Sequence, residues 1–409
     1  MRVVILTQYY PPELGAPQGR LSDLARRFMA DGHEPIVLTA MPNYPTGRIF
    51  KGYGGLFRRE RIEGIQVLRC WLYPNQGVGF VGRLASYFSF VLTSAVVGAW
   101  MLPKADFLLT ESPPLFLGLS GYLLSRWKGA RWIFNVSDLW PESAVHLGIL
   151  GGKGWAHRAA SWLEAFCYRR AWLVSGQSEE ILESIRKRFP GTSTYHLSNG
   201  VDPEAFHPAR RSPEARRRLI ELAGVAEPAC VVLYAGLHGV AQGLDQVLES
   251  AARLRNHPEI RVLLLGDGPA KRQLQQRAAE LGLDGVKFLD AQPRESVPSL
   301  LAAADIAIVP LKLRLPGAVP SKIYEAMGAA VPIVLVASGE PAEIVQAARA
   351  GVAVAPDDPE GLTAALEALA GDSELRSALG KAGRQAAETR FNRRIIAEKF
   401  MRFLGESAC

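Results

Sequence analysis

The fold is decided by residues 3–39, which read VVILTQYYPPELGAPQGRLSDLARRFMADGHEPIVLT. The first five of these residues form a run dominated by β-branched side chains, the pattern of a strand buried on both faces of a parallel sheet. After a loop rich in Pro and Gly, we expect a helix from about Arg20 to Ala30, and Gly32 just beyond it suits the left-handed residue that ends many helices. A second strand over residues 34–39 completes a βαβ unit.

The same alternation continues through the chain. Further strands are predicted at residues 66–72, 107–109, 132–136, 171–175, 230–235, 262–266, 286–289, 306–310, 333–336 and 351–354. Helices are expected between them, for example over residues 243–256 and 270–281. Alternating strands and helices indicate the α/β class, with parallel sheets covered by helices on both faces.

The length of 409 residues indicates more than one domain, because a single core seldom grows this large. We expect two Rossmann-like domains, the first over residues 1–198 and the second over residues 199–390. A last helix within residues 391–409 is expected to cross back to the first domain. Ligands of open parallel sheets bind beyond the carboxyl ends of the strands, so both domains are expected to face a central cleft.

The positive charge is concentrated in the first half. Residues 1–195 contain 22 Lys and Arg against 14 Asp and Glu, whereas the remainder contains 25 against 26. This excess suggests an anionic partner such as membrane headgroups or a phosphorylated lipid, with solvated surface charge as the alternative. No recognised motif accompanies it, so we expect no nucleic-acid partner.

Residues 84–102 are uncharged for 19 positions, which is the length of a membrane-spanning helix. Their Ser and Thr content and their place between two predicted strands favour a helix of the α/β domain, or one that touches the bilayer surface. The N-terminal apolar run is too short for a signal peptide. Cys70, Cys167, Cys230 and Cys409 are far apart, which predicts reduced thiols and no metal site in a cytoplasmic protein.

Two glycine-rich turns follow strands of the second half. In residues 234–245, YAGLHGVAQGLD, the glycines Gly236 and Gly239 would let the backbone approach a phosphate at a helix N-terminus. His238 and Gln242 are the side chains expected to reach the donor diphosphate there. Gly266 and Gly268 flank Asp267 in a turn expected to line the nucleotide base. Plain βα turns, the second capped by Asp267, are the alternative for both.

Residues 316–328 read PGAVPSKIYEAMG and predict a helix that begins near Pro320, with Ser321 as its cap. Lys322 and Glu325 are three positions apart and share a face. Lys322 suits a diphosphate, and Glu325 suits a ribose diol because a carboxylate accepts two hydroxyl hydrogen bonds. The alternative is an exposed ion pair between the two side chains.

In the first half, Asp138 and Glu142 follow the strand at residues 132–136 and are the candidate catalytic carboxylates. Either carboxylate would position or deprotonate an acceptor hydroxyl, and helix capping is the alternative for Asp138.

The first loop offers Gly15 and Arg20 for the donor and its phosphates, although Arg20 also fits a surface position at a helix start. Contact with the acceptor is predicted for Glu13, Asn43, Tyr44 and Arg48.

The motifs at residues 8–13 (QYYPPE), 138–143 (DLWPES), 199–202 (NGVD), 266–268 (GDG) and 320–325 (PSKIYE) resemble, in order and spacing, the retaining glycosyltransferases of family 4. The resemblance covers nearly the whole chain. It implies the GT-B fold, with an acceptor-side domain over residues 1–198 and a nucleotide-sugar donor domain over residues 199–390. The resemblance is strongest to bacterial surface-polysaccharide enzymes of the fucosamine and colanic-acid type. Such enzymes usually have two donor-site glutamates eight positions apart; here Glu325 matches the second and Gly317 stands at the first.

Two further positions depart from the family pattern. Gln242 replaces an expected Lys, which leaves Lys322, with Arg314, to meet the diphosphate charge, and Ser137 replaces a frequent His. The resemblance implies transfer of a hexosyl or N-acetylhexosaminyl group from a UDP- or GDP-sugar, without metal or cofactor.

The implied acceptor is a glycan on undecaprenyl diphosphate at the inner face of the cell membrane. A nucleotide-sugar 2-epimerase on the same fold and a non-catalytic sugar-nucleotide-binding subunit are the alternatives.

Overall fold

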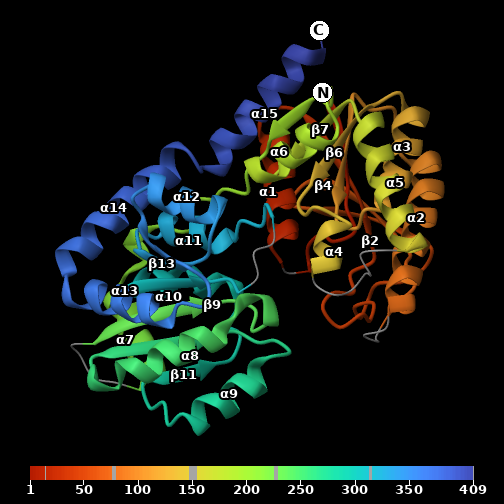
Figure 1. Cartoon of the computed structure of the whole chain (residues 1–409). Helices are drawn as coiled ribbons and strands as arrows, with labels where there is room; N and C mark the ends of the chain where they lie inside the picture. The colour runs from red at the N-terminus through yellow and green to blue at the C-terminus, as the bar shows by residue number, and fades with distance from the viewer. Residues whose placement is uncertain (14, 76–79, 147–153, 225–228, 313–315, 409) are drawn as a thin grey trace. The chain divides into compact units, whose positions relative to one another are not determined.

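The computed structural model describes the chain except for residues 14, 76–79, 147–153, 225–228, 313–315 and 409 (Figure 1). The chain forms two compact units. The first comprises residues 1–199, 315–318 and 396–409, and the second comprises residues 200–314 and 319–395. Each unit consists of a largely parallel sheet with helices, which confirms the predicted α/β class.

The first unit is built on an eight-stranded sheet with the order β3-β4-β2-β1-β5-β6-β7-β8. Its strands are β1 (Arg2–Leu6), β2 (Glu34–Ala40), β3 (Phe57–Ile62), β4 (Ile65–Cys70), β5 (Phe107–Ser112), β6 (Arg131–Val136), β7 (Leu173–Gly176) and β8 (Thr194–His196). All neighbours are parallel except β3 and β4. The strand order reverses between β1 and β5, which is where ligands of such sheets bind.

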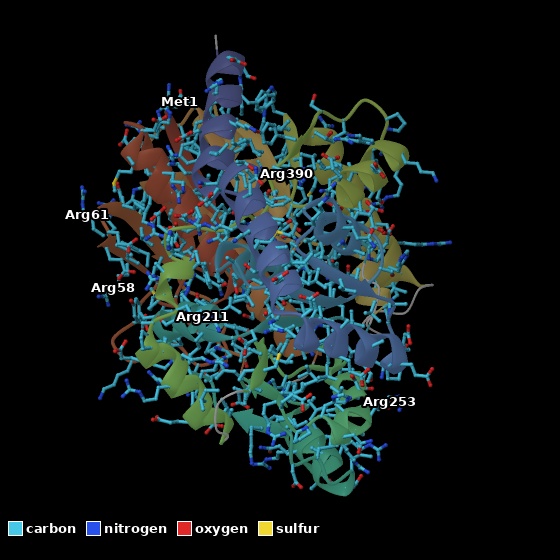
Figure 2. All side chains as sticks on the ribbon, turned by 90° about the vertical axis from the view of Figure 1, so that its left-hand side faces the viewer. Met1, Arg58, Arg61, Arg211, Arg253 and Arg390 are labelled. Atoms are coloured by element: carbon cyan, nitrogen blue, oxygen red, sulfur yellow. The ribbon has the colours of Figure 1, made fainter. Side chains whose placement is uncertain are left out.

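The strands β8 and β3, at the two edges of this sheet, were missed by the sequence prediction. The longer of the two is β3. It forms a hairpin with β4 through Glu63 and Gly64, whose φ values of 49° and 83° both lie in the left-handed region that two-residue hairpins require. Its sequence, FRRERI, lacks the apolar pattern of a buried strand. Arg58 and Arg61 project from this edge into solvent (Figure 2), and charges on an edge strand oppose pairing with another chain.

Helices cover both faces of the first sheet (Figure 1). The helices of this unit are α1 (Ala16–Ala30), α2 (Phe80–Met101), α3 (Leu117–Lys128), α4 (Glu142–His146), α5 (Trp155–Arg170), α6 (Glu179–Arg188) and, from Ile396 onward, α15 (Arg393–Ala408). Residues of α2, α3, α5 and α6 share one apolar core, and residues of α1 and α15 share the other. Helix α1 begins four residues before the predicted start, because Pro17 is suited to a first helical turn.

Within α2, residues Gly82–Met101 are long and apolar enough to cross a membrane. One side of the helix packs into the unit: Phe90 and Val97 belong to the core, and the Ser94 hydroxyl lies 2.9 Å from the Ser120 hydroxyl of α3. The Thr93 hydroxyl donates a hydrogen bond to the Trp71 carbonyl. These contacts attach α2 to the sheet along one side and leave the other side exposed.

The second unit has a six-stranded parallel sheet with the order β11-β10-β9-β12-β13-β14. Its strands are β9 (Cys230–Ala235), β10 (Ile260–Leu265), β11 (Val286–Leu289), β12 (Ile306–Pro310), β13 (Ile333–Val336) and β14 (Gly351–Val354), at the six predicted places. Its longer helices are α7 (Pro213–Ala223), α8 (Leu244–Arg253), α9 (Lys271–Glu280), α10 (Val297–Ala303), α11 (Ser321–Gly328), α12 (Glu340–Ala347), α13 (Pro359–Gly371) and α14 (Ser373–Thr389). The order reverses between β9 and β12, so the segments that follow these strands meet at one point of the edge.

Candidate functional site

The two glycine turns of the second unit touch each other beyond the ends of β9 and β10. A Cβ atom at Gly266 would overlap the carbonyl oxygen of Gly236, and one at Gly268 would overlap the backbone of His238. The φ values of Gly266 and Gly268 are 144° and 156°. Both positions therefore require glycine, because the backbones approach more closely than any side chain permits.

Lys322 reaches this turn from the first turn of α11. A Cβ atom at Gly236 would overlap Lys322 Cε, so the side chain passes directly over this glycine. Its ammonium lies 5.7 Å from the centre of the Tyr234 ring. Within the described part of the chain no carboxylate pairs with it. A positive charge without a counter-ion thus stands at the N-terminus of a helix, where the backbone dipole also favours an anion.

Glu325 faces the same helix turn but does not pair with Lys322. Its Oε1 accepts a hydrogen bond of 3.1 Å from the Ser321 hydroxyl, and the alternative of a Lys322–Glu325 ion pair is not found among the described residues. The predicted cap was wrong, since Pro320 is the N-cap and Ser321 is the first helical residue. The half-buried carboxylate keeps acceptor capacity for hydroxyl groups.

The His238 ring is fully buried, with an exposed fraction of 0%. It packs between Tyr234 and Phe288, and no hydrogen-bond partner is found for either ring nitrogen among the described residues. Burial lowers the pKa of the imidazole below its ordinary value, and nearby Lys271 adds to this effect. In this structure the ring is thus part of the packed interior beneath the loop. Its predicted contact with a diphosphate stays a prediction.

Lys271 was missed by the sequence analysis and holds the Gly266 turn in place. Its buried Nζ donates hydrogen bonds to the Gly266 carbonyl at 2.9 Å and to Asp290 at 2.6 Å. Gly239 and Gln242 lie on the other side of the loop, where a Cβ at Gly239 would crowd the Gln242 amide. A hollow of about 640 Å³ borders this side, between α8 and α9.

At the carboxyl edge of the first sheet, Arg20 is the centre of a buried polar network. Its guanidinium pairs with Glu111 at 2.6 Å and donates to Ser137 at 2.8 Å. It also donates to Asn199 at 2.9 Å and to Gln177 at 3.4 Å. Arg20 is only 6% exposed, so the alternative of a surface arginine is wrong. Its predicted role in phosphate binding stays a prediction.

The partners of Arg20 were not selected from the sequence as site residues. Glu111 also accepts a hydrogen bond of 2.7 Å from the Asn135 amide, and Asn135 accepts one from Ser175. Glu111, Asn135 and Ser175 are polar residues near the carboxyl ends of the buried strands β5, β6 and β7. Polar side chains at the carboxyl end of a buried strand are the signal that would have found them.

Glu13 ties two loops of the first unit together. Its buried carboxylate accepts backbone hydrogen bonds of 2.8 Å from Asn43 and from Tyr44, and one of 3.2 Å from Tyr10. Burial raises the pKa of the carboxyl group, although these three N–H groups oppose the shift. Tyr44 and Arg48 are exposed beside this junction, whereas Asn43 is buried. Of the four residues predicted to contact the acceptor, Glu13, Asn43 and Tyr44 are thus joined by hydrogen bonds.

Asp138 and Glu142 both follow β6 but have different surroundings. The Ser143 hydroxyl donates a hydrogen bond to Asp138 Oδ1, and burial raises the pKa of this carboxyl group above its ordinary value of 3.8. Glu142 begins the short helix α4 and lies 3.3 Å from Arg188, which also pairs with the buried Glu164. Asp138 is thus the more buried and the less neutralised of the two predicted catalytic groups.

Two glycines of the first unit occupy constrained positions. Gly15 is the N-cap of α1, where a Cβ atom would overlap the Gln18 amide. Gly317 has a φ of 77°, donates its N–H to Glu180 at 2.9 Å, and leaves no room for a Cβ beside Ile181. A glutamate at position 317 would not fit, which accounts for the departure from the family pattern. Arg314 lies outside the described residues.

No group of three or more His, Cys, Asp or Glu residues that could hold a metal ion occurs in the described part of the chain.

Replacing Arg20 by Met is expected to reduce the free energy of unfolding of the first unit by about 3–5 kcal/mol, because Glu111 would remain buried without a partner. Urea unfolding followed by circular dichroism measures this change. Arg402→Met, at an exposed position of α15, is the matched control and should unfold like the wild type. A stable Arg20→Met protein would show that the network does not hold the unit together.

Gly266→Ala and Gly236→Ala are expected to differ in stability. The first places a Cβ against backbone and should cost about 1–3 kcal/mol, whereas the second meets the flexible end of Lys322, which can move aside. Thermal unfolding of both variants tests the contact. Equal midpoints for the two variants would contradict the close approach of the turns.

Comparisons with known proteins agree with this geometry. Residues 220–386 match the family described as "Glycosyl transferases group 1", and residues 15–200 match the "Glycosyl transferase 4-like domain". The chain is 30% identical over 333 residues to the colanic acid biosynthesis glycosyl transferase WcaI of Escherichia coli, covering 79% of this chain and 80% of that one. It is 31% identical to a GDP-mannose-dependent phosphatidylinositol monomannoside mannosyltransferase of Mycolicibacterium smegmatis, covering 62% and 72%.

Solved structures show the same fold at low identity. Sucrose-phosphate synthase from Thermosynechococcus elongatus superposes with a TM-score of 0.78 at 18% identity, covering 99% of this chain and 98% of that one. HepE of Anabaena, in complex with UDP and glucose, superposes with a TM-score of 0.74 at 20% identity, covering 99% and 100%. The chain therefore belongs to the glycosyltransferases of family 4 and has the GT-B fold.

Proposed function

We propose that the chain is a retaining, metal-independent enzyme that transfers a hexosyl or N-acetylhexosaminyl group from a UDP- or GDP-sugar. Its proposed acceptor is a glycan on undecaprenyl diphosphate, met by a peripheral protein at the inner face of the cell membrane. Family membership already makes the chain a glycosyltransferase of glycan biosynthesis that uses a nucleotide-sugar donor. The observation that carries the donor part of the proposal is the Lys322 ammonium above the Gly236 turn, with which no carboxylate pairs among the described residues.

The donor half of the proposal rests on the second unit. The diphosphate would bind at the Gly236–Gly239 loop, where Lys322 and the start of α11 supply positive potential to the leaving group. Glu325 would accept hydrogen bonds from the ribose hydroxyls, and the Gly266–Gly268 turn would border the base. Both UDP and GDP are kept as candidates, because HepE was solved with UDP whereas the mycobacterial relative is named as GDP-mannose-dependent.

The acceptor half rests on Asp138. Its carboxylate would accept a hydrogen bond from the attacking hydroxyl and orient it toward the anomeric carbon. The hydroxyl oxygen bonds to that carbon as the bond to the diphosphate oxygen breaks, and the hydroxyl proton passes to the departing phosphate on the same face. The sugar thus keeps its anomeric configuration. The net charge does not change, because the proton lost by the hydroxyl is gained by the leaving diphosphate.

The lipid-linked acceptor is supported by the names of relatives and by charge. One relative acts on a phosphatidylinositol mannoside, and another, of Rhizobium meliloti, acts in lipopolysaccharide core biosynthesis. The excess of basic residues within residues 1–195 would favour an acceptor that carries a diphosphate.

We expect either UDP or GDP, at 100 times its dissociation constant, to stabilise the protein by roughly 2.7 kcal/mol. The stabilisation should fall sharply in Glu325→Ala, which removes the proposed ribose contact. It should also fall in Lys322→Met, which removes the positive charge proposed to face the diphosphate. A thermal-shift titration with each nucleotide measures both effects.

The control for this titration is Glu374→Ala, an exposed carboxylate on α14 that should respond like the wild type. No shift with any nucleotide, in a folded sample, would contradict the donor site and favour the non-catalytic alternative. Turnover of the sugar nucleotide without an acceptor would instead favour the 2-epimerase.

Asp138→Asn is expected to lower kcat by about 10²–10⁴-fold while the nucleotide thermal shift stays unchanged. Because burial raises the pKa of Asp138, the wild-type rate should fall toward low pH through a pKa above 3.8, and this limb should vanish in the variant. Steady-state transfer rates from pH 4 to 8 measure both effects. Glu142→Gln, whose native carboxylate is already paired with Arg188, serves as the comparison. A variant with full activity would remove Asp138 from the mechanism.

A further inference from the structure

Three helices on one face of the first sheet carry exposed apolar side chains. Helices α2, α3 and α5 lie next to one another, with α3 in contact with both of the others. Their exposed residues recur at spacings of four or seven along each helix, as on one face of a helix. They are Phe88, Leu92, Val96 and Trp100 of α2, Leu123 and Trp127 of α3, and Trp155 and Trp162 of α5.

The exposure of these side chains is far greater than a soluble core helix requires. Trp155 is 84% exposed, Trp100 77% and Trp127 74%. On the inner side of the same helices, Phe90, Leu124 and Leu163 are buried in the core. Helix α2 is therefore held on the sheet by its inner side, and its outer side presents an apolar surface. Clustered exposed aromatic groups of this kind mark an interaction surface.

The charges on these helices are of one sign. The sequences of α2, α3 and α5 contain six Lys and Arg residues and a single acidic residue, Glu164. Glu164 is buried and paired with Arg188, so it does not offset the basic residues at the surface. The basic residues are Arg83, Arg126, Lys128, Arg158, Arg169 and Arg170.

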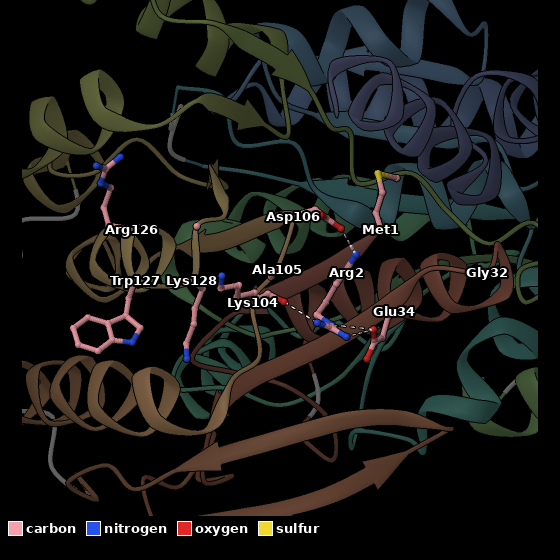
Figure 3. A pocket seen from close by; sticks show the side chains of 11 residues that line it. Met1, Arg2, Gly32, Glu34, Lys104, Ala105, Asp106, Arg126, Trp127 and Lys128 are labelled. Atoms are coloured by element: carbon pink, nitrogen blue, oxygen red, sulfur yellow. Dashed lines mark hydrogen bonds and ion pairs between the residues drawn. The ribbon is translucent and has the colours of Figure 1, made fainter. Parts of the chain in front are cut away.

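A hollow of about 850 Å³ adjoins the end of α3, at the amino ends of β1 and β5 and thus at the edge opposite Arg20 and Asp138 (Figure 3). Arg126, Trp127 and Lys128 project from the end of α3 beside it (Figure 3). Arg2 is paired with Glu34 there, whereas no carboxylate pairs with Arg126 or Lys104 in the described part of the chain. Unpaired basic groups thus lie next to an exposed indole.

We infer that the surface formed by α2, α3 and α5 binds the headgroup region of an anionic lipid bilayer. Exposed Trp side chains insert at the interface between headgroups and acyl chains, and basic side chains beside them attract anionic headgroups. A second copy of the chain is the other occupant of suitable size. A twofold interface would place this surface against itself, so basic residues would face basic residues and repel.

The inference rests on the proposed function, because a lipid-linked acceptor would bring the protein to a membrane. Its test measures vesicle binding and does not depend on turnover. The full chain is floated with vesicles of phosphatidylcholine and with vesicles containing equal parts of phosphatidylcholine and phosphatidylglycerol. Two triple variants are compared with the wild type: Leu92→Gln with Val96→Gln and Trp127→Gln, and Arg126→Gln with Arg158→Gln and Arg170→Gln. Met29→Gln and Arg402→Gln, at exposed positions on the opposite face of the same sheet, are the matched controls.

The wild type is expected to bind the anionic vesicles and to lose this binding in high salt. Removing three basic residues should weaken partitioning by about a hundredfold, at roughly fivefold for each residue. The apolar triple variant should also lose binding, and both controls should float like the wild type.

Several results would overturn the inference. They are failure of the wild type to float, equal binding to both kinds of vesicle, or triple variants that float like the wild type. Self-association in sedimentation velocity that the apolar triple variant abolishes would assign the surface to a second copy. The nucleotide thermal shift of every variant is recorded in parallel, so a failed donor site and a failed membrane surface give different results.

Discussion

At the carboxyl edge of the second sheet, the carbonyl oxygen of Gly236 occupies the space that a Cβ atom at Gly266 would need. The arrangement of the candidate donor site depends on this backbone contact. It brings two turns from neighbouring strands together, leaves room for Lys322 to pass over Gly236, and places the start of α11 beside them. Glycine is needed at Gly266 because any side chain there would separate the two turns.

At the carboxyl edge of the first sheet, a buried ion pair takes the place of a close backbone contact. There the ends of β5, β6 and β7 carry polar groups that a buried arginine joins, so Arg20 fixes the positions of Glu111 and Ser137. Asp138 is the residue after Ser137, and its orientation depends on the same segment. A buried ion pair such as Arg20–Glu111 contributes little net stability, because both charges lose their hydration, but it fixes the positions of its partners. In its proposed role of orienting a hydroxyl group, Asp138 would benefit from a fixed backbone.

Most strands of both sheets could be predicted because continuous apolar runs separated by turns are typical of buried parallel strands, whereas the three-residue strand β8, with the sequence TYH, offers no such run. Lys322 and the Gly236 loop were both expected at a diphosphate, and the structure brings them together where the strand order reverses between β9 and β12. The edge strand β3 could not be predicted, because its charged and mostly exposed sequence lacks the apolar pattern of a buried strand. The direction of the His238 ring and the left-handed backbone of Gly317 depend on packing between segments far apart in the chain, which no local pattern contains.

Hydrogen–deuterium exchange with and without UDP and GDP tests the central claim, the location of the donor site, most directly. The account predicts that one nucleotide slows exchange in three separate segments, around residues 236–243, 266–270 and 321–325, while exchange in α13 and α14 does not change. Protection confined to the hollow between α8 and α9, or the absence of protection at residues 321–325, would contradict it.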